Sequence, residues 1–321
     1  MLICGGTGFI GRNLAEYYGP SDEYEVFATY FTSKPPAIPG VTFVQADLRR
    51  QEDVKRVMLG MDVVLQAAAT TSGSNEIVHK PYYHVTDNAV MNSLILREAF
   101  ECGIQQFVFF SCTVMYQPSD KPLTEGDYSE SDEVFPSYFG VGWTKVYIEK
   151  MCRFYSRICD TKFTVLRHSN IYGPYDKYDL ERSHVFGATV TKVMRAEENS
   201  DIVVWGEGKE GRDLLYVRDL MKAVDLALRK QKEPYKLVNI GYGEAITVAD
   251  LVKKIVQLSG KHLTVKFDKT KPNIPTRLCL DCTKAKELYG WERETSLDDG
   301  IIETLEWYQK HIDENCMLKN E

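Results

Sequence analysis

The sequence lacks several features that mark other classes of protein. None of its apolar stretches reaches membrane-spanning length, and it opens on a predicted strand instead of a signal peptide. Its net charge is -7 and it has no basic run, which argues against a nucleic-acid partner. It also has no repeat or low-complexity segment. We therefore expect a globular, cytoplasmic protein that binds neither membranes nor nucleic acid.

The eight cysteines of the chain are scattered. Cys279 and Cys282 are spaced like half of a zinc site, but no second pair accompanies them. The neighbouring Leu278 and Leu280 indicate a strand. We therefore predict that the eight cysteines are reduced structural thiols and that no metal is bound.

What the sequence does contain is a glycine-rich turn in an informative context. The apolar run Leu2–Cys4 predicts a buried parallel strand, and residues 12–18 have helical spacing. Between them, one glycine permits the turn, the next lets backbone approach a pyrophosphate, and the third lets the helix pack on the strand. The helix N-terminus adds the positive end of a dipole. The expected dinucleotide cradle comprises Gly5, Gly8, Phe9, Ile10 and Gly11.

Strands and helices alternate along most of the chain. Strands are expected at 24–30, 41–44, 61–65, 107–110, 163–166, 237–240 and 263–267. Helices are expected at 51–59, 88–102, 137–156, 219–228, 247–258 and 297–308. This alternation predicts an α/β fold with a Rossmann-type, doubly wound parallel sheet, whose ligands bind beyond the carboxyl ends of the strands.

The same pattern predicts two interleaved domains. Residues 1–167 form the dinucleotide-binding domain, and residues 213–243 return to it. Residues 168–212 and 244–321 form a smaller α/β substrate domain. The length of 321 residues suits two closely joined domains with ample core.

Residues that follow the predicted strands suggest how the dinucleotide is held. Asp47 and Leu48 are expected beside the adenine, and the small residues Ala67, Ala68 and Ala69 would let backbone lie against the cofactor. The segment 30–34 (YFTSK) has no acid to bind a ribose 2′-hydroxyl and only one possible cation for a 2′-phosphate. Because no arginine follows this strand, we expect NAD(H), with NADP(H) as the alternative.

These residues resemble the extended short-chain dehydrogenase/reductases that modify nucleotide sugars. The resemblance covers GGTGFIG at 5–11, AAA at 67–69, a helix opening at Asn88, SCTVMY at 111–116 and NIYGP at 170–174. Motifs in the C-terminal half look like GDP-L-fucose synthase: SHV at 183–185, VVWGEG at 203–208, RDLLYV at 212–217, VNIG at 238–241 and DKTKP at 268–272. That enzyme epimerises a GDP-4-keto-6-deoxymannose and then reduces it with NADPH.

The resemblance also identifies a departure from the family pattern. The family moves a proton through a tyrosine acidified by a lysine four residues later; the lysine here is Lys145, but Val141 stands at the tyrosine position. Tyr138 lies seven residues before Lys145, about 10 Å along a helix, too far for direct contact. The family's serine position falls at Cys112, and the neighbouring Thr113 is our preferred hydroxyl.

Residues for the substrate follow from the resemblance in the same way. The histidine that moves a proton during epimerisation matches His184, whereas the corresponding cysteine position carries Val114. Asn170 opens the substrate region, and Arg212 and Arg277 are candidates for the diphosphate or its ribose because guanidinium groups bind phosphate oxygens in pairs.

The expected function is oxidation or reduction at carbon 4 of a GDP-manno-type sugar, including the GDP-heptoses of bacterial surface polysaccharides. Two alternatives remain open: an epimerase-reductase with relocated acids, and a non-catalytic dinucleotide-binding subunit. The resemblance further implies a homodimer built through the predicted helices at 88–102 and 143–156.

Overall fold

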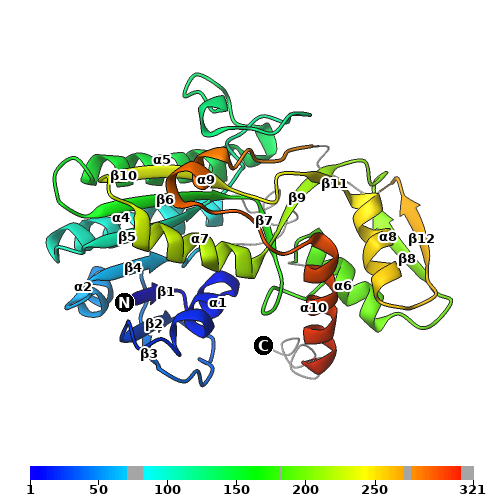
Figure 1. The fold of residues 1–321 in the computed structure, drawn as a ribbon, viewed down its shortest axis with the longest axis horizontal. Helices are drawn as coiled ribbons and strands as arrows, with labels where there is room; N and C mark the ends of the chain where they lie inside the picture. The colour runs from blue at the N-terminus through cyan, green and yellow to red at the C-terminus, as the bar shows by residue number, and fades with distance from the viewer. Residues whose placement is uncertain (71–81, 181–182, 271–275, 312–321) are drawn as a thin grey trace.

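Seven parallel strands form the main sheet of the computed structural model, which describes residues 1–70, 82–180, 183–270 and 276–311 (Figure 1). The strands are β1 (Leu2–Cys4), β2 (Val26–Tyr30), β3 (Val41–Gln45), β4 (Val63–Gln66), β5 (Gln106–Ser111), β6 (Lys162–His168) and β10 (Tyr235–Ile240). Their order is β10-β6-β5-β4-β1-β2-β3, so the direction of winding reverses between β1 and β4. Ligands of such sheets bind at this switch point, and the glycine-rich turn follows β1 directly. The predicted doubly wound sheet is confirmed.

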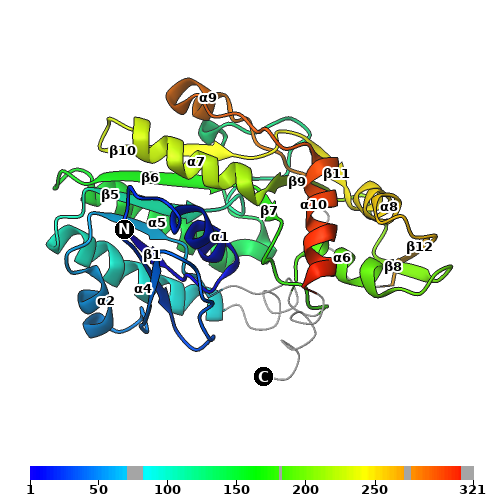
Figure 2. The ribbon, with the colours of Figure 1, turned by 60° about the horizontal axis from the view of Figure 1, so that its bottom comes forward.

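Helices cover both faces of the main sheet (Figures 1 and 2). One face carries α1 (Phe9–Tyr18), α7 (Val217–Lys230) and α9 (Thr283–Tyr289). The other carries α2 (Gln51–Met58), α4 (Tyr82–Glu101) and α5 (Phe139–Tyr155). Since both faces are buried, the central strands are almost continuously apolar, as in the FVFF of β5.

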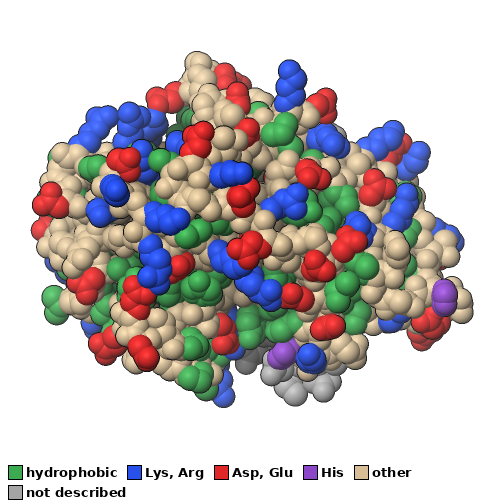
Figure 3. Space-filling model, in the orientation of Figure 1, with side chains coloured by type: hydrophobic (Ala, Val, Ile, Leu, Met, Phe, Trp, Pro, Cys, Tyr) green, Lys and Arg blue, Asp and Glu red, His purple; other side chains and the backbone are tan. Residues whose placement is uncertain are grey.

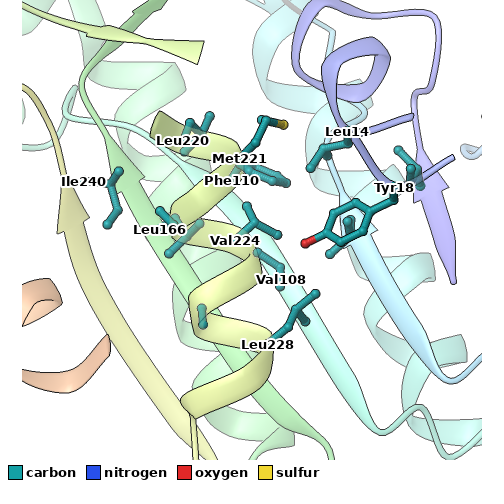
Figure 4. Close-up of a cluster of buried hydrophobic side chains, with 14 of the residues drawn as sticks. Leu14, Tyr18, Val108, Phe110, Leu166, Leu220, Met221, Val224, Leu228 and Ile240 are labelled. Atoms are coloured by element: carbon teal, nitrogen blue, oxygen red, sulfur yellow. The ribbon is translucent and has the colours of Figure 1, made fainter. Parts of the chain in front are cut away.

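The α1/α7 face shows how these residues hold the layers together (Figure 4). Leu14 and Tyr18 of α1 and Leu220, Met221, Val224 and Leu228 of α7 project onto Val108, Phe110, Leu166 and Ile240 of the sheet. All are buried, and each such side chain contributes roughly 1.5–3 kcal/mol when removed from water. This packing fixes α1 against the sheet, and with it the turn that precedes α1.

A smaller lobe contains the remaining regular structure. A three-stranded sheet, ordered β11-β9-β7, consists of β7 (Asn170–Tyr172), β9 (Gly211–Tyr216) and β11 (Ala245–Thr247). A two-stranded parallel sheet joins β8 (Asp201–Trp205) to β12 (Thr264–Asp268). The helices are α6 (Val185–Arg195), α8 (Val248–Leu258) and α10 (Leu297–Lys310), and they share one apolar cluster with the strands. Two short 3-10 helices belong instead to the lobe of the main sheet: η1 (Glu125–Asp127) contacts β10, and η2 (Pro136–Tyr138) precedes α5.

The chain passes between the lobes more than once. After β9 it forms α7 and then β10, which pairs with β6 over six residues of each strand and so completes the main sheet. The strand predicted at 237–240 is thereby confirmed at the edge of the main sheet. After β10 the chain enters β11 and so returns to the smaller lobe. Helix α9, later in the chain, packs against α7 and β10. The boundaries given above for the two domains stay a prediction.

Two local predictions are wrong. Helix α4 begins at Tyr82, so Asn88 lies in its second turn and does not open it. Leu278–Leu280 is not a strand: Leu280 only forms an isolated bridge to Leu123. The cause is that this segment is held by tertiary contacts; the Leu280 N–H, for instance, donates to Asp213 at 3.0 Å.

The seven cysteines in the described ranges are free thiols, and Cys282 accepts a hydrogen bond from the Gly241 N–H at 3.1 Å. Among the described residues, no helix has the length and apolar character needed to cross a membrane. On the face drawn in Figure 3, Lys and Arg side chains lie interspersed with Asp and Glu.

Candidate functional site

The glycine turn after β1 has the geometry that its spacing predicts. Gly5 has a φ of +79°, and a Cβ there would lie 2.7 Å from the Ala68 Cα. A Cβ on Gly11 would lie only 2.0 Å from the Gly5 carbonyl oxygen, so glycine is required for helix and turn to touch. Gly8 is exposed, and its Cβ would meet only the Gly5 oxygen, at 3.3 Å. Contacts within the protein thus require glycine at positions 5 and 11. Gly8 is not required by such contacts, and its lack of a side chain leaves the backbone there accessible to a ligand.

The start of α1 offers unpartnered donors at this opening. Gly8 caps the helix without any side-chain hydrogen bond, and its carbonyl accepts from the Arg12 N–H at 2.7 Å. The amides of Phe9 and Ile10 belong to the first turn, where no intrahelical acceptor exists. With the helix dipole behind them, these groups fit a pyrophosphate. The residues present therefore fit a dinucleotide.

The residues after β4 support the turn more than they line it. Ala67 and Ala68 are half-buried against the two cores and Ala69 is exposed, so for Ala68 the small size serves close packing on Gly5. Asn88 fixes the following backbone: its side chain accepts from the Thr70 N–H at 2.9 Å and donates to the Thr70 carbonyl at 3.0 Å.

At the far end of the expected cofactor site, Asp47 and Leu48 follow β3. The Leu48 side chain is buried in the core. Asp47 accepts from Arg49 Nε at 2.9 Å, and this hydrogen bond lowers the pKa of its carboxyl. Arg49 also pairs with Asp87 at 2.9 Å and lies over the Phe31 ring, so this cation is engaged within the protein.

Lys145 lies on α5 with its ammonium group turned to the end of β5. Its Nζ donates to the Phe110 carbonyl at 2.8 Å and sits 4.8 Å from the centre of the Phe109 ring. The surrounding protein lowers the pKa of Lys145 by desolvation, which the nearby Cys112 and Glu149 partly offset. The lysine is thus placed at the carboxyl edge of the sheet, where ligands of this fold bind.

The side chain one turn before Lys145 is Val141, which is half-buried and has no proton to give. Tyr138 is the last residue of the 3-10 turn η2 and the N-cap of α5, so the predicted helix start near Tyr138 is confirmed. Burial raises the pKa of the Tyr138 phenol, and the charge of Arg212 partly lowers it. Tyr138 is therefore within electrostatic range of Arg212.

The three residues at the end of β5 have different surroundings. Ser111 is fully buried and donates to Glu149 Oε1 at 2.6 Å. Burial raises the pKa of the Cys112 thiol, although the Lys145 charge opposes this. Thr113 is half-buried, and its hydroxyl makes no hydrogen bond within the described part of the chain. Of the two hydroxyls, only that of Thr113 remains available to a ligand.

Sequence reasoning missed a buried ion pair beneath Lys145. Glu149, one turn after Lys145, accepts from Arg167 Nη2 at 2.7 Å, and both side chains are 4% exposed. Arg167 Nη1 donates to the Tyr116 hydroxyl at 3.0 Å, which in turn donates to Asn239 at 2.8 Å. The network ties α5 to β6 and β10. The i,i+4 spacing of Lys145 and Glu149 was the one available signal; the arginine partner is visible only in the fold.

The two candidate arginines are brought together. Gly211 bridges Arg277 in parallel, and a Cβ on Gly211 would lie 2.5 Å from the Arg277 Cγ. Arg212 Nη1 donates to the Thr276 carbonyl at 2.6 Å. Arg277 extends its guanidinium toward solvent near Asp120, at 3.7 Å, and borders an open groove of ≈ 480 Å³ beside β11.

Buried Asp213 holds this arginine region to the main sheet. Its carboxylate accepts from the N–H groups of Tyr242 at 2.7 Å, Gly243 at 3.2 Å and Leu280 at 3.0 Å. Asn170, on the neighbouring strand β7, donates its amide to the Asp213 carbonyl at 3.1 Å. The segments carrying Arg212 and Arg277 are therefore fixed to one another and to the end of β10.

Histidines complete the edge. His184 caps α6 at the surface, and the protein around it and the charges of Lys177 and Arg212 lower its pKa. His168 is the last residue of β6, and burial together with the charges of Lys145 and His184 lowers its pKa. Sequence reasoning did not single out His168, although it directly follows the apolar run of β6 at the edge where ligand-contacting residues are expected.

A doubly wound parallel sheet with a glycine turn at its switch point defines a fold of the Rossmann class. The chain belongs to the NAD dependent epimerase/dehydratase family, whose model matches residues 1–241.

Three similar proteins illustrate this membership. GDP-L-colitose synthase of Yersinia pseudotuberculosis is 24% identical over 96% of this chain and 97% of its own. GDP-L-fucose synthase of Azorhizobium caulinodans is 26% identical over 96% of both chains. The UDP-glucose 4-epimerase of Thermotoga maritima, solved with UDP-glucose, has a TM-score of 0.83 and 27% identity, covering 97% of this chain and 99% of that one. The distant similarity to GDP-sugar enzymes agrees with the motifs that suggested it.

Proposed function

We propose that this protein is an NAD(P)-dependent oxidoreductase that oxidises or reduces carbon 4 of a GDP-linked, manno-type hexose or heptose in surface polysaccharide biosynthesis. The observation that carries the proposal is the state of α5. Lys145 is kept and aimed at the end of β5, while the position one turn earlier is Val141. Oxidation or reduction at carbon 4 moves one proton, whereas epimerisation moves further protons at the sugar carbons, so a site with valine at both 141 and 114 suits the simpler reaction.

The cofactor proposed is NAD(H). A bound nicotinamide would supply the hydride acceptor or donor, and its pyrophosphate would be held by the amides of Phe9 and Ile10 beside Gly8. The family is described as NAD dependent, and the cation nearest the end of β3, Arg49, is already paired with two carboxylates. NADP(H) is the alternative, and parallel titrations with NADH and NADPH distinguish the two.

The proposed substrate residues come mainly from the smaller lobe. Arg212 and Arg277 would bind the diphosphate, helped by Asn170, and His184 would lie beside the sugar. Thr113 would hold the reacting oxygen, and Lys145 would orient the ribose of the cofactor. Support for a GDP-linked sugar comes from the relatives named for GDP-L-colitose and GDP-L-fucose synthesis.

A spectroscopic titration tests the proposal. The purified protein, loaded with NAD⁺, is mixed with GDP-mannose and with GDP-heptose while absorbance near 340 nm is followed; UDP-glucose is the matched control. We expect reduced cofactor to appear with a GDP-linked sugar and not with UDP-glucose. Reduction by UDP-glucose alone would contradict the GDP assignment, and cofactor binding without any redox change would favour a non-catalytic dinucleotide-binding subunit.

An epimerase-reductase with relocated acids is the rival enzymatic function. Two of the positions that the GDP-fucose synthase pattern uses for proton transfer are Val141 and Val114, and neither side chain can exchange a proton. Epimerisation would incorporate solvent deuterium at carbons 3 and 5 of a GDP-4-keto sugar, so mass spectrometry in D₂O separates this function from simple hydride transfer.

We also propose a cytoplasmic homodimer formed through α4 and α5. These helices pack side by side and expose Val90, Tyr147 and Phe154, which are 43%, 46% and 55% accessible. Leu96 and Val146 are instead buried within the subunit, so they do not carry the interface. Free thiols in the described ranges suit a reducing compartment. A monomer in sedimentation at micromolar concentration would refute the dimer.

A further inference from the structure

His168 lies at the same edge of the main sheet as Lys145, and the proposed function assigns it no role. As the last residue of β6 it lies at the carboxyl edge of the sheet, next to the end of β5, and its ring centre is 6.5 Å from that of Phe110. The Phe110 carbonyl is also the acceptor for Lys145 Nζ, at 2.8 Å. His168 and Lys145 therefore both contact Phe110 of β5, the first through its ring and the second through a hydrogen bond to the Phe110 carbonyl.

The hydrogen bonding of the ring defines its tautomer. Nδ1 lies 2.8 Å from the carbonyl oxygen of Ser169, an acceptor only, so a neutral ring carries its proton on Nδ1. Nε2 then has a lone pair. Nε2 makes no hydrogen bond within the described residues. It is also not one of the fully buried polar atoms that lack a partner in that part of the chain, so the atom keeps some exposure. Since the residue is half-buried, Nε2 is the atom that a molecule in the site can reach.

The charges around His168 keep the ring neutral. Burial, together with the charges of Lys145 from α5 and His184 from the start of α6, lowers its pKa to about 4, against the hydrogen bond to the Ser169 carbonyl, which raises it. The groups that act on this imidazole thus lie on α5, at the start of α6 and directly after β6. A neutral imidazole with an open Nε2 is a proton acceptor at physiological pH.

We propose that Nε2 of His168 is the proton acceptor that replaces the phenol missing at Val141. The inference rests on the proposed function. When the C4–H hydride leaves the sugar for NAD⁺, the hydroxyl proton passes to Nε2 and the C–O bond becomes C=O. NAD⁺ is reduced and the sugar is oxidised. The Nδ1–H bond to Ser169 then stabilises the imidazolium. In the reverse direction, the same Nε2–H protonates the forming alkoxide.

The experiment combines two readouts. His168→Gln and His168→Ala are compared with His262→Gln, a control at an exposed histidine of the smaller lobe. Single-turnover reduction of bound NAD⁺ by GDP-mannose is measured across pH, and NADH affinity separately. We expect the His168 variants to lose about 10²–10⁴-fold in rate with unchanged NADH affinity, and added imidazole to restore part of the rate of His168→Ala. A rate within threefold of wild type would overturn the proposal, as would a parallel loss of cofactor affinity.

The second readout needs no turnover. In ¹⁵N-histidine NMR spectra of the apoprotein, assigned by loss of one signal in His168→Gln, we expect His168 to be neutral at pH 6 with its proton on Nδ1. The Nε2 signal should shift when GDP-mannose is added. A proton on Nε2, or no shift, would overturn the proposal. If wild-type protein oxidises no nucleotide sugar, the proposed function fails, and these spectra still decide the assignment of His168. If His168→Gln does not fold, the signal is assigned by its loss in His168→Ala instead.

Discussion

Replacing Gly8 by valine should remove the cofactor and leave the fold. Gly8 is exposed, its φ of -80° and ψ of 166° suit any residue, and a Cβ would meet only the Gly5 oxygen at 3.3 Å. The cost to the helix is that of a poor N-cap, of the order of 1 kcal/mol. A branched side chain would, however, fill the space through which the pyrophosphate reaches the amides of Phe9 and Ile10.

The size of the effect follows from the hydrogen bonds lost. A hydrogen bond to a charged group contributes about 1.5–3 kcal/mol, so two amides account for about 3–6 kcal/mol. This corresponds to roughly a 10²–10⁴-fold rise in the dissociation constant. NADH fluorescence titration measures the affinity, and thermal melting of the apoprotein measures the fold.

Gly11→Ala is the matched control, because its Cβ would lie 2.0 Å from the Gly5 carbonyl oxygen. Here we expect the stability of the apoprotein to fall, by about 1–3 kcal/mol or more, since the backbone must move. If Gly8→Val melts normally and still binds NADH with wild-type affinity, the assignment of the cradle is refuted.

Further substitutions test the rest of the site. Lys145→Ala should depress single-turnover hydride transfer sharply. Val141→Tyr should leave cofactor and substrate binding intact and raise the rate of hydride transfer where the pocket has room. Unchanged rates in all three of Lys145→Ala, Thr113→Val and His184→Ala would contradict this site. Glu149→Gln should cost about 3–5 kcal/mol in urea unfolding, because Arg167 is left buried without its partner, whereas the exposed Glu130→Gln should change nothing measurable. Asp176→Asn should raise Tm relative to wild type at pH 8 and not at pH 4. Burial raises the pKa of the Asp176 carboxyl to about 7, so the native state of the wild type loses stability as pH rises through that value. A difference in Tm that does not depend on pH would refute the raised pKa of Asp176.

The sequence could predict what depends on local backbone. The glycines at 5 and 11 are required by contacts within one strand-turn-helix unit, so their spacing alone identified the cradle. The N-cap role of Thr247 is equally local, and its hydroxyl accepts from the Asp250 N–H at 3.1 Å. Both sets of contacts span only a few residues along the chain, and the fold class follows from repeating such units.

Features fixed by distant partners could not be predicted. Nothing local marks Arg167 as the partner of Glu149, eighteen residues away, or shows that Asp213 collects amides from two later segments. The strand expected near Cys279 failed for the same reason, since alternating apolar residues there are pinned by Asp213 and Leu123 instead of by a sheet neighbour. The residue-by-residue roles of the site remain predictions because they depend on these contacts.

Helix α5 connects the two halves of the proposed chemistry. Lys145 and Glu149 lie one turn apart on it: the first is anchored to β5, and the second to β6 through Arg167. Val141, one further turn toward the N-terminus, lies beside neither anchor. Helix α5 therefore carries Lys145 and Glu149, which fix the edge of the sheet, and lacks a phenol at position 141 that would transfer a proton. In the proposed mechanism the proton must then move through a different element, and the end of β6, which the same ion pair holds in place, brings His168 to Lys145. A variant that loosens this pair should accordingly slow hydride transfer even where the protein remains folded.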